Sequence, residues 1–264
     1  MTFEPTGGYE KSFREFLKCS RINFTTVHPN KVRSYAKAKG WLAKTDVVDA
    51  KLLADFATIF SLSTKQEYAS EVQRKLYSLI QRREQLILYK TQEITRLETI
   101  TDEYSIKSIK AHIKYLDKTL ADTQKRIKDC ISSSDELRSK VSNLTSIPGV
   151  GITLATNAIC ELPELDLLEF NKLTALVGLA PYARESGQFK GRRSIFAGRH
   201  NIRKVLYMTA VASLRCNKRL KEFYDRLIKN HKAPKVALVA VMRKLLSFMH
   251  IIIQRHTMWD EKIC

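Results

Sequence analysis

Acidic side chains are scarce in this sequence, whose 264 residues include 27 Asp and Glu but 46 Lys and Arg. The net charge of +19 leaves many cations without an internal partner, and it predicts a polyanionic partner, either nucleic acid or an anionic membrane surface. Hydrophobic residues make up 44% of the chain, so we expect a folded core and exclude global disorder.

Cysteine and histidine are also sparse, and they form no metal-binding or catalytic pattern. The five cysteines lie far apart without any C-x-x-C, and the six histidines include no H-E-x-x-H. This distribution argues against a disulfide framework, a zinc site and thiol catalysis. It is typical of a protein from a reducing cytoplasm.

Long uninterrupted hydrophobic runs are missing as well. The best run, residues 237–253, is interrupted by Arg243, Lys244 and His250, so we expect no membrane span. The N-terminus has neither the basic nor the apolar segment of a secretion signal. These absences favour nucleic acid over a membrane as the partner.

Glycine and proline are absent from residues 65–144. Positions 109–144 include a series with alternating steps of four and three, in which nine of the eleven residues are apolar or cysteine. This heptad pattern, with a second apolar stretch at 76–97, predicts two long helices that form an antiparallel hairpin or a coiled-coil dimerisation arm. Two ordinary packed helices are the alternative.

The two flanking regions belong to different fold classes. In residues 1–64, short helical segments alternate with a β-like run at 24–27, which indicates an α/β domain. Residues 144–264 are typical of an all-α domain, so we predict three domains, at 1–64, 65–143 and 144–264. Four apolar residues of the last domain are expected in its core: Met208, Val211, Leu245 and Met249.

A tight P-G-V-G turn at residues 148–151 precedes an apolar helix. This pattern is typical of a helix-hairpin-helix, whose turn and helix N-terminus offer backbone N–H groups to a DNA phosphate. Gly149 and Gly151 are therefore candidate DNA contacts, although many such turns have no ligand.

A basic segment, residues 184–219, contains ten Lys and Arg and a single acid, Glu185. Such a cluster requires anions, and a serine within it suits phosphoryl transfer on DNA, which makes Ser186 a candidate nucleophile and Ser194 its rival. The alternative is a solvated basic loop with an incidental serine. The candidate nucleic-acid contacts in this segment are Lys190, Arg192, Arg193, Arg199, Arg203 and Lys204.

Three carboxylates are candidates for a metal site in this basic chain. Glu4 lies at the end of a predicted strand, and the spacing of Asp46 and Asp49 places both on one face of a helical first turn. The helix dipole alone explains one acid at this position. Carboxylate oxygens suit Mg²⁺, which would hold a DNA phosphate.

Several motifs resemble those of the IS110-family transposases. E-P-T-G-G-Y-E and the stretch V-H-P-N-K-V-R to D-V-V-D-A-K-L-L-A resemble the family's first domain. I-P-G-V-G-I-T-L-A, L-V-G-L-A-P, the Ser-Gly step and I-R-K-V-L-Y-M-T-A resemble its last domain. The order and spacing of the motifs fit the family across nearly the whole chain.

The resemblance implies a RuvC-like, RNase H-type domain, a coiled-coil linker and a helical transposase domain. It also implies that Glu4, Asp46 and Asp49 are three of the four acids of a Mg²⁺ site and that Ser186 is the nucleophile. Such an enzyme recombines DNA through a 5′-phosphoserine intermediate, guided by a structured non-coding RNA. Its composite site forms between subunits of a dimer or tetramer in the bacterial cytoplasm, at the nucleoid.

One departure from the family pattern affects the first domain. The family opens with a G-I-D-V-S-K strand that carries the first acid, whereas this chain begins three residues before Glu4. The resemblance therefore predicts a truncated chain and an incomplete RuvC-like sheet with a bare edge. A catalytically inactive remnant that binds DNA or RNA is the alternative function.

Overall fold

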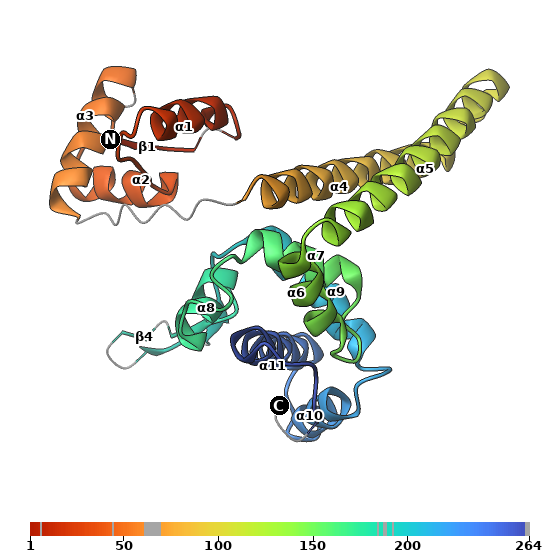
Figure 1. Ribbon diagram of the computed structural model, residues 1–264. Coiled ribbons are helices and arrows are strands. Elements are labelled where there is room, and N and C mark those ends of the chain that lie inside the picture. The colour runs from red at the N-terminus through yellow and green to blue at the C-terminus, as the bar shows by residue number, and fades with distance from the viewer. Residues whose placement is uncertain are drawn as a thin grey trace. The chain divides into compact units, whose positions relative to one another are not determined.

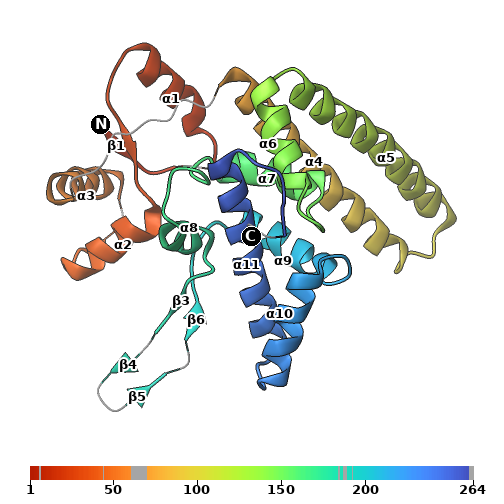
Figure 2. The ribbon, with the colours of Figure 1, turned by 60° about the horizontal axis from the view of Figure 1, so that its bottom comes forward.

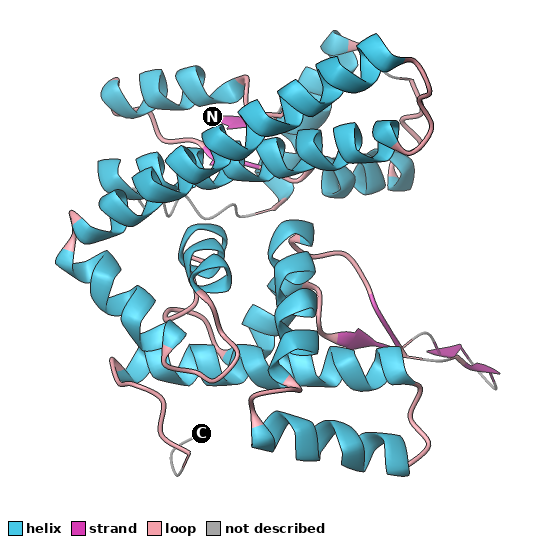
Figure 3. Ribbon diagram, turned by 90° about the vertical axis from the view of Figure 1, so that its right-hand side faces the viewer, coloured by secondary structure: helices cyan, strands magenta, loops and turns pink. Residues whose placement is uncertain are grey.

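A computed structural model describes residues 1–5, 7–43, 45–60, 70–183, 185–186, 189–191 and 193–261, with the backbone alone at residues 11, 18, 185, 186, 189 and 190. The chain divides into two compact units, Met1–Tyr68 and Ala69–Cys264, which we describe separately. Most of the described residues are helical, and the strands are short (Figure 3). The domain boundary predicted at residues 64–65 lies outside the described residues.

The first unit contains the α/β arrangement that its sequence predicts. Strands β1 and β2 pair in parallel, with Thr2 opposite Thr25 and Phe3 opposite Thr26, and a helix connects them (Figure 1). Parallel neighbours require such a crossover connection. The elements of this unit are β1 (Thr2–Phe3), α1 (Glu10–Cys19), β2 (Thr25–Thr26), α2 (Pro29–Ala38) and α3 (Asp46–Ile59).

Helices α2 and α3 enclose the small core of this unit. The hydroxyl of Thr45 accepts a hydrogen bond from the N–H of Val48 at 3.3 Å, which caps α3. Beside the core, Tyr35 donates to Asp55 at 2.6 Å, and hydrogen bonds from Lys39 and then from Tyr35 lower the pKa of the Asp55 carboxyl. The buried residues of this core are Val27, Val32, Ala36, Leu52 and Phe56.

The second unit begins with the predicted pair of long helices. Helices α4 (Glu71–Leu97) and α5 (Glu103–Ser132) pack side by side as an antiparallel hairpin within the chain (Figure 1). Ser70 caps α4 through a reciprocal capping box with Gln73, and Asp102 caps α5. We call α4 and α5 the arm.

The spacing of the heptad pattern suggests one continuous helix to residue 144, but the structure has two helices there. Helix α5 ends at Ser132, and α6 (Asp135–Thr145) begins after Ser134, whose hydroxyl accepts from the N–H of Leu137 at 3.4 Å. Serine competes with helical backbone bonds through its hydroxyl and favours caps, so a run of three serines ends one helix and starts the next.

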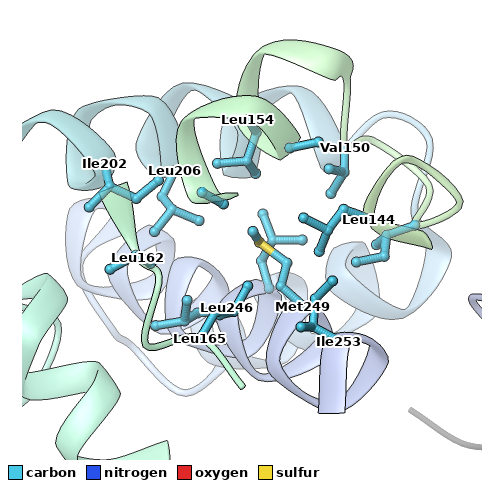
Figure 4. Packing of buried hydrophobic residues seen from close by; sticks show 14 of the residues in the cluster. Leu144, Val150, Leu154, Leu162, Leu165, Ile202, Leu206, Leu246, Met249 and Ile253 are labelled. Atoms are coloured by element: carbon cyan, nitrogen blue, oxygen red, sulfur yellow. The ribbon is translucent and has the colours of Figure 1, made fainter. Parts of the chain in front are cut away.

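The core of the second unit surrounds the apolar helix α11 (Pro234–Arg255). Leu246 and Met249 of α11 meet Leu144, Leu154 and Leu206 from three other helices (Figure 4). The root of the arm belongs to the same cluster through residues such as Leu76, Ile80 and Ile127. The other helices are α7 (Ile152–Glu161), α8 (Phe170–Val177), α9 (His200–Ser213) and α10 (Lys218–Lys229).

Helix α11 is long and apolar enough to cross a membrane, by length and composition only. In this unit, however, 56% of its most apolar window is buried inside the protein. Its apolar residues therefore serve as the centre of a helical core.

Two of the four predicted core residues are wrong. Leu245 and Met249 are fully buried, whereas Met208 is 62% exposed and Val211 is 37% exposed. Helix α9 turns Ile202, Leu206 and Ala210 inward at helical spacing, so Met208 and Val211 lie outside the buried stripe.

This difference predicts unequal effects of two substitutions on α9. Leu206→Ala removes a fully buried side chain and should lower the free energy of unfolding by about 2–5 kcal/mol. Met208→Ala, two residues away, should change it by less than about 1 kcal/mol. Urea unfolding followed by circular dichroism measures both, and equal effects would contradict this assignment of the core.

Candidate catalytic and nucleic-acid site

The basic segment folds as a β-ribbon. Strand β3 (Pro181–Tyr182) pairs antiparallel with β6 (Ser194–Ile195), and β4 (Glu185–Ser186) pairs with β5 (Phe189–Lys190). The ribbon extends away from the helices of its unit (Figure 2). Because Ser186 is opposite Phe189, the chain reverses direction between these two residues. Ser186 therefore lies next to the turn of the ribbon, whereas Ser194 lies in the strand that leads back to α9.

Several predicted contacts of this segment lie wholly or partly outside the described residues. Arg192 and Gly187 lie outside the described residues, and the structure describes only the backbone of Ser186 and Lys190. Arg193 and Lys204 are exposed to solvent. These two side chains are accessible to a polyanion.

Two of the predicted nucleic-acid contacts are engaged within the protein. The guanidinium of Arg199 donates two hydrogen bonds of 2.6 Å to the carboxylate of Glu164, and it also donates to the carbonyl of Glu161. Such a bidentate pair occupies the groups that would otherwise bind a phosphate. Arg203 donates to the carbonyl of Ala197 at the foot of the ribbon. Both arginines therefore fix the foot of the ribbon.

The P-G-V-G turn is a packing element as well as the start of a helix. Gly149 has a φ of +94°, and a Cβ there would lie 2.3 Å from Oγ and 2.8 Å from Cα of Ser213 on α9. Asn217 donates to the Pro148 carbonyl at 3.2 Å. In contrast, Gly151 is exposed, has an ordinary φ of −89° and is the N-cap of α7. Of the two glycines, Gly151 is the accessible one.

The first turn of α7 borders a hollow of about 230 Å³. Arg83 of the arm donates to the hydroxyl of Thr153 at 3.2 Å, and Lys128 of α5 also lines the hollow. Sequence reasoning missed both cations, because no local motif relates the arm to the turn at residues 148–151.

Two of the three candidate carboxylates share a hollow in the first unit. Glu4 follows β1, Asp49 lies in the first turn of α3, and both line a hollow of about 250 Å³ with Asn30 and Arg33 of α2. Asp46 is exposed on the same turn of α3. Within the described parts of the chain, no three His, Cys, Asp or Glu side chains are grouped so that they could hold a metal.

The paired carboxylates nevertheless fit the requirements of a magnesium ion. Mg²⁺ is usually held by one or two carboxylates, water and the phosphates of a substrate, without a complete protein cage. Glu4 and Asp49 supply that number of carboxylates in one hollow. Arg33 and Asn30, which line it too, were not singled out from the sequence.

Neither the half-buried Cys160 nor the buried Cys130 adds a nucleophile. Burial, followed by the charges of Glu161 and Cys130, raises the pKa of the Cys160 thiol to about 12. Burial also raises the pKa of Cys130. Because a thiolate is the reactive form, both side chains are unreactive at neutral pH.

Two family models of transposases match the chain. Residues 141–225 match the model described as "Transposase IS116/IS110/IS902 family", and residues 1–106 match a second model, of the DEDD-type IS110 transposases, described as "Transposase". The "Pilin gene-inverting protein" of Moraxella lacunata is 27% identical over 267 residues, covering 100% of this chain and 82% of the relative. The protein of the same name from Moraxella bovis is similar to the same extent.

These matches define a DNA-rearranging class of protein, in agreement with the motifs, the basic ribbon and the helical second unit. The chain belongs to the IS110 family of transposases. Membership implies DNA binding, and the DEDD type implies a requirement for a divalent metal.

The two glycines of the P-G-V-G turn should respond differently to substitution. Gly149→Ala forces a side chain against Ser213 at a positive φ and should cost about 2–4 kcal/mol of stability. Gly151→Ala meets no atom within 4 Å and should cost less than about 1 kcal/mol. Thermal melting of both variants checks this difference, and a stable Gly149→Ala protein would contradict the packing of the turn.

Proposed function

We propose that this transposase cleaves and exchanges DNA strands with the hydroxyl of Ser186 as its nucleophile. The observation that carries the proposal is the position of Ser186 in β4, next to the turn of a basic ribbon that extends from the helical body. A nucleophile at this position can reach a DNA backbone outside the protein. Ser194, in contrast, lies in β6, whose pairing with β3 forms the foot of the ribbon close to α9.

The reaction is a phosphoryl transfer. The Ser186 Oγ attacks a backbone phosphorus, the bond from phosphorus to the 3′ oxygen breaks, and the phosphate becomes esterified to serine at the 5′ end. The serine proton passes to a base, and the departing 3′ oxygen takes up a proton. Attack by a 3′ hydroxyl of another strand reverses these steps and joins the new pair, without any external energy source.

Glu4 and Asp49 are the residues that would hold a divalent metal, with Asp46 on the adjoining turn and a fourth acid completing a DEDD set. The metal, proposed to be Mg²⁺, would polarise the phosphate and stabilise its developing charge. The two carboxylates hold their positions through the β1–β2 pair and the capped first turn of α3. Exposed cations such as Arg193 would position the DNA.

The arrangement of units supports an oligomer. In the proposed RuvC-like assignment, the acids lie in the first unit and the serine lies in the second. A composite site would combine the acids of one subunit with the serine of another, in a dimer or tetramer that the arm joins as a coiled coil. A structured non-coding RNA, bound by the basic surface, would guide the complex to its DNA in the bacterial nucleoid.

Substitution of the two serines distinguishes the nucleophile. Ser186→Ala should abolish the covalent protein–DNA adduct, because alanine has no hydroxyl to form the ester. Ser194→Ala should retain adduct formation within about threefold, which corresponds to less than 1 kcal/mol in the barrier. The adduct is measured on denaturing gels after incubation with labelled DNA, the guide RNA and Mg²⁺.

An adduct formed by Ser186→Ala would refute the assignment. If the unaltered chain binds DNA but forms no adduct under any of these conditions, the non-catalytic DNA- or RNA-binding alternative is correct.

Neutralising the paired carboxylates tests the metal site. The double variant Glu4→Gln, Asp49→Asn should reduce strand exchange at least about 100-fold, because the divalent ion loses two of its proposed ligands. The double variant Glu103→Gln, Asp122→Asn, at exposed positions on α5, is the matched control and should have no effect. Calorimetry with Mg²⁺ should show weaker binding for the double variant, and unchanged binding would refute the site.

A further inference from the structure

Three cations surround a hollow of about 270 Å³ between the last two helices. Arg219 and Arg226 of α10 and Lys244 of α11 line it, with Glu222 and Phe223. Helices α10 and α11 pack directly against each other (Figure 2). The hollow therefore belongs to one rigid pair of helices within the second unit, and none of its residues is part of the proposed serine or carboxylate site.

Aromatic rings hold these cations close to the hollow. The Nζ atom of Lys244 lies 5.1 Å from the ring centre of Phe223, and the Cζ atom of Arg226 lies 5.4 Å from the same ring. Arg219 lies 5.9 Å from the ring centre of Phe248. Cation–π contacts at these distances restrict long side chains without neutralising their charge. The positive groups are thus arranged before any ligand arrives.

The described residues supply no ion pair that balances the charge of the cluster. Among the described residues, no acidic oxygen lies within 4 Å of the charged groups of Arg219, Arg226 or Lys244, although Lys221 on the same helix pairs with Asp225 at 3.3 Å. Of the described residues that line the hollow, Glu222 alone is acidic. Burial lowers the pKa of Lys244, and the charges of Arg219 and Arg226 lower it further.

Within the part of the chain that the structure describes, few of the hydrogen-bond donors of the cluster have a partner. Among the described residues, the guanidinium of Arg219 donates one hydrogen bond, to the carbonyl of Glu261 at 2.6 Å. A guanidinium has five donors, whose fork matches the oxygens of a phosphate. Arg199 differs from these cations, because its guanidinium forms an ion pair with the carboxylate of Glu164. The cluster thus has the charge and the donors to bind an oxyanion.

We propose that the hollow formed by Arg219, Arg226, Lys244 and Phe223 binds the phosphodiester backbone of a nucleic acid, with each of the three cations in contact with a phosphate. The proposal deepens the proposed function and rests on its nucleic-acid partner, but not on the identity of the nucleophile. Contacts of this kind position a nucleic acid without reading its sequence. Lys244 and α11 lie beyond residues 141–225, which match the transposase family model. Arg219 and Phe223 lie within the matched residues, whereas Arg226 and Lys244 lie beyond them, so the site extends past the end of the matched segment.

The salt dependence of binding tests this proposal on the full chain. The triple variant Arg219→Gln, Arg226→Gln, Lys244→Gln is compared with Lys218→Gln, Lys221→Gln, Lys229→Gln, which removes equal charge from exposed positions of α10. Affinities for a labelled DNA duplex and a labelled single-stranded RNA are measured by fluorescence anisotropy between low and high salt. Both probes have arbitrary sequences.

The hollow variant should lower the log–log salt slope on duplex DNA by roughly 2–3, since each phosphate contact contributes about 0.9. On the RNA probe the expected decrease is about 2, at about 0.7 per contact. The control variant should change either slope by less than about 1. A loss on one probe alone supports the site and assigns its phosphate to that nucleic acid. Slopes equal to those of the control on both probes would overturn the proposal.

A charge-preserving variant separates this effect from misfolding. Arg219→Lys, Arg226→Lys, Lys244→Arg should retain the slope, and circular dichroism reports the folding of every variant. If the glutamine triple variant is unfolded, the single Arg226→Gln change should lower the duplex slope by about 0.9, and an unchanged slope would overturn the site. Ser186→Ala should keep the unaltered slope, so a failed nucleophile assignment and a failed anchor give different results.

Discussion

The burial of α11 is the packing constraint on which the second unit depends. It contacts four other helices of this unit, α6, α8, α9 and α10. The foot of the ribbon, the P-G-V-G turn and the root of the arm are therefore positioned against one cluster. Removal of large side chains from such a core has consequences well beyond the substituted residue. The burial of α11 also positions the cation cluster, because Lys244 lies on the side of α11 that faces α10.

Periodicity predicted most of the helices, because burial of one face leaves a regular trace in the sequence. It failed where local chemistry overrides spacing, as at the three serines that end α5 and start α6. It also failed for Met208, because an apolar residue on a helix is not buried when its face has no neighbour. The β-ribbon was missed because strands of two residues have too little alternation to be recognised.

The candidate site was predicted in part for similar reasons. Motif resemblance and helical spacing singled out Glu4 and Asp49, which line one hollow. Charge counting along the sequence could not separate Arg199, which is paired with Glu164, from cations without a carboxylate partner. That distinction depends on contacts between residues far apart in the chain. For the same reason, the sequence shows Lys244 only as an interruption of an apolar run and does not predict its place beside the cations of α10.

The break between α5 and α6 has a mechanical consequence. Because the root of α4 and α5 is embedded in the same core as α11, the arm cannot pivot freely about the serines that follow it. At 1.5 Å per residue, the 30 residues of α5 span about 45 Å. The arm is therefore a spacer of defined length: a molecule gripped at its far end is kept at a set distance from the body that carries the ribbon.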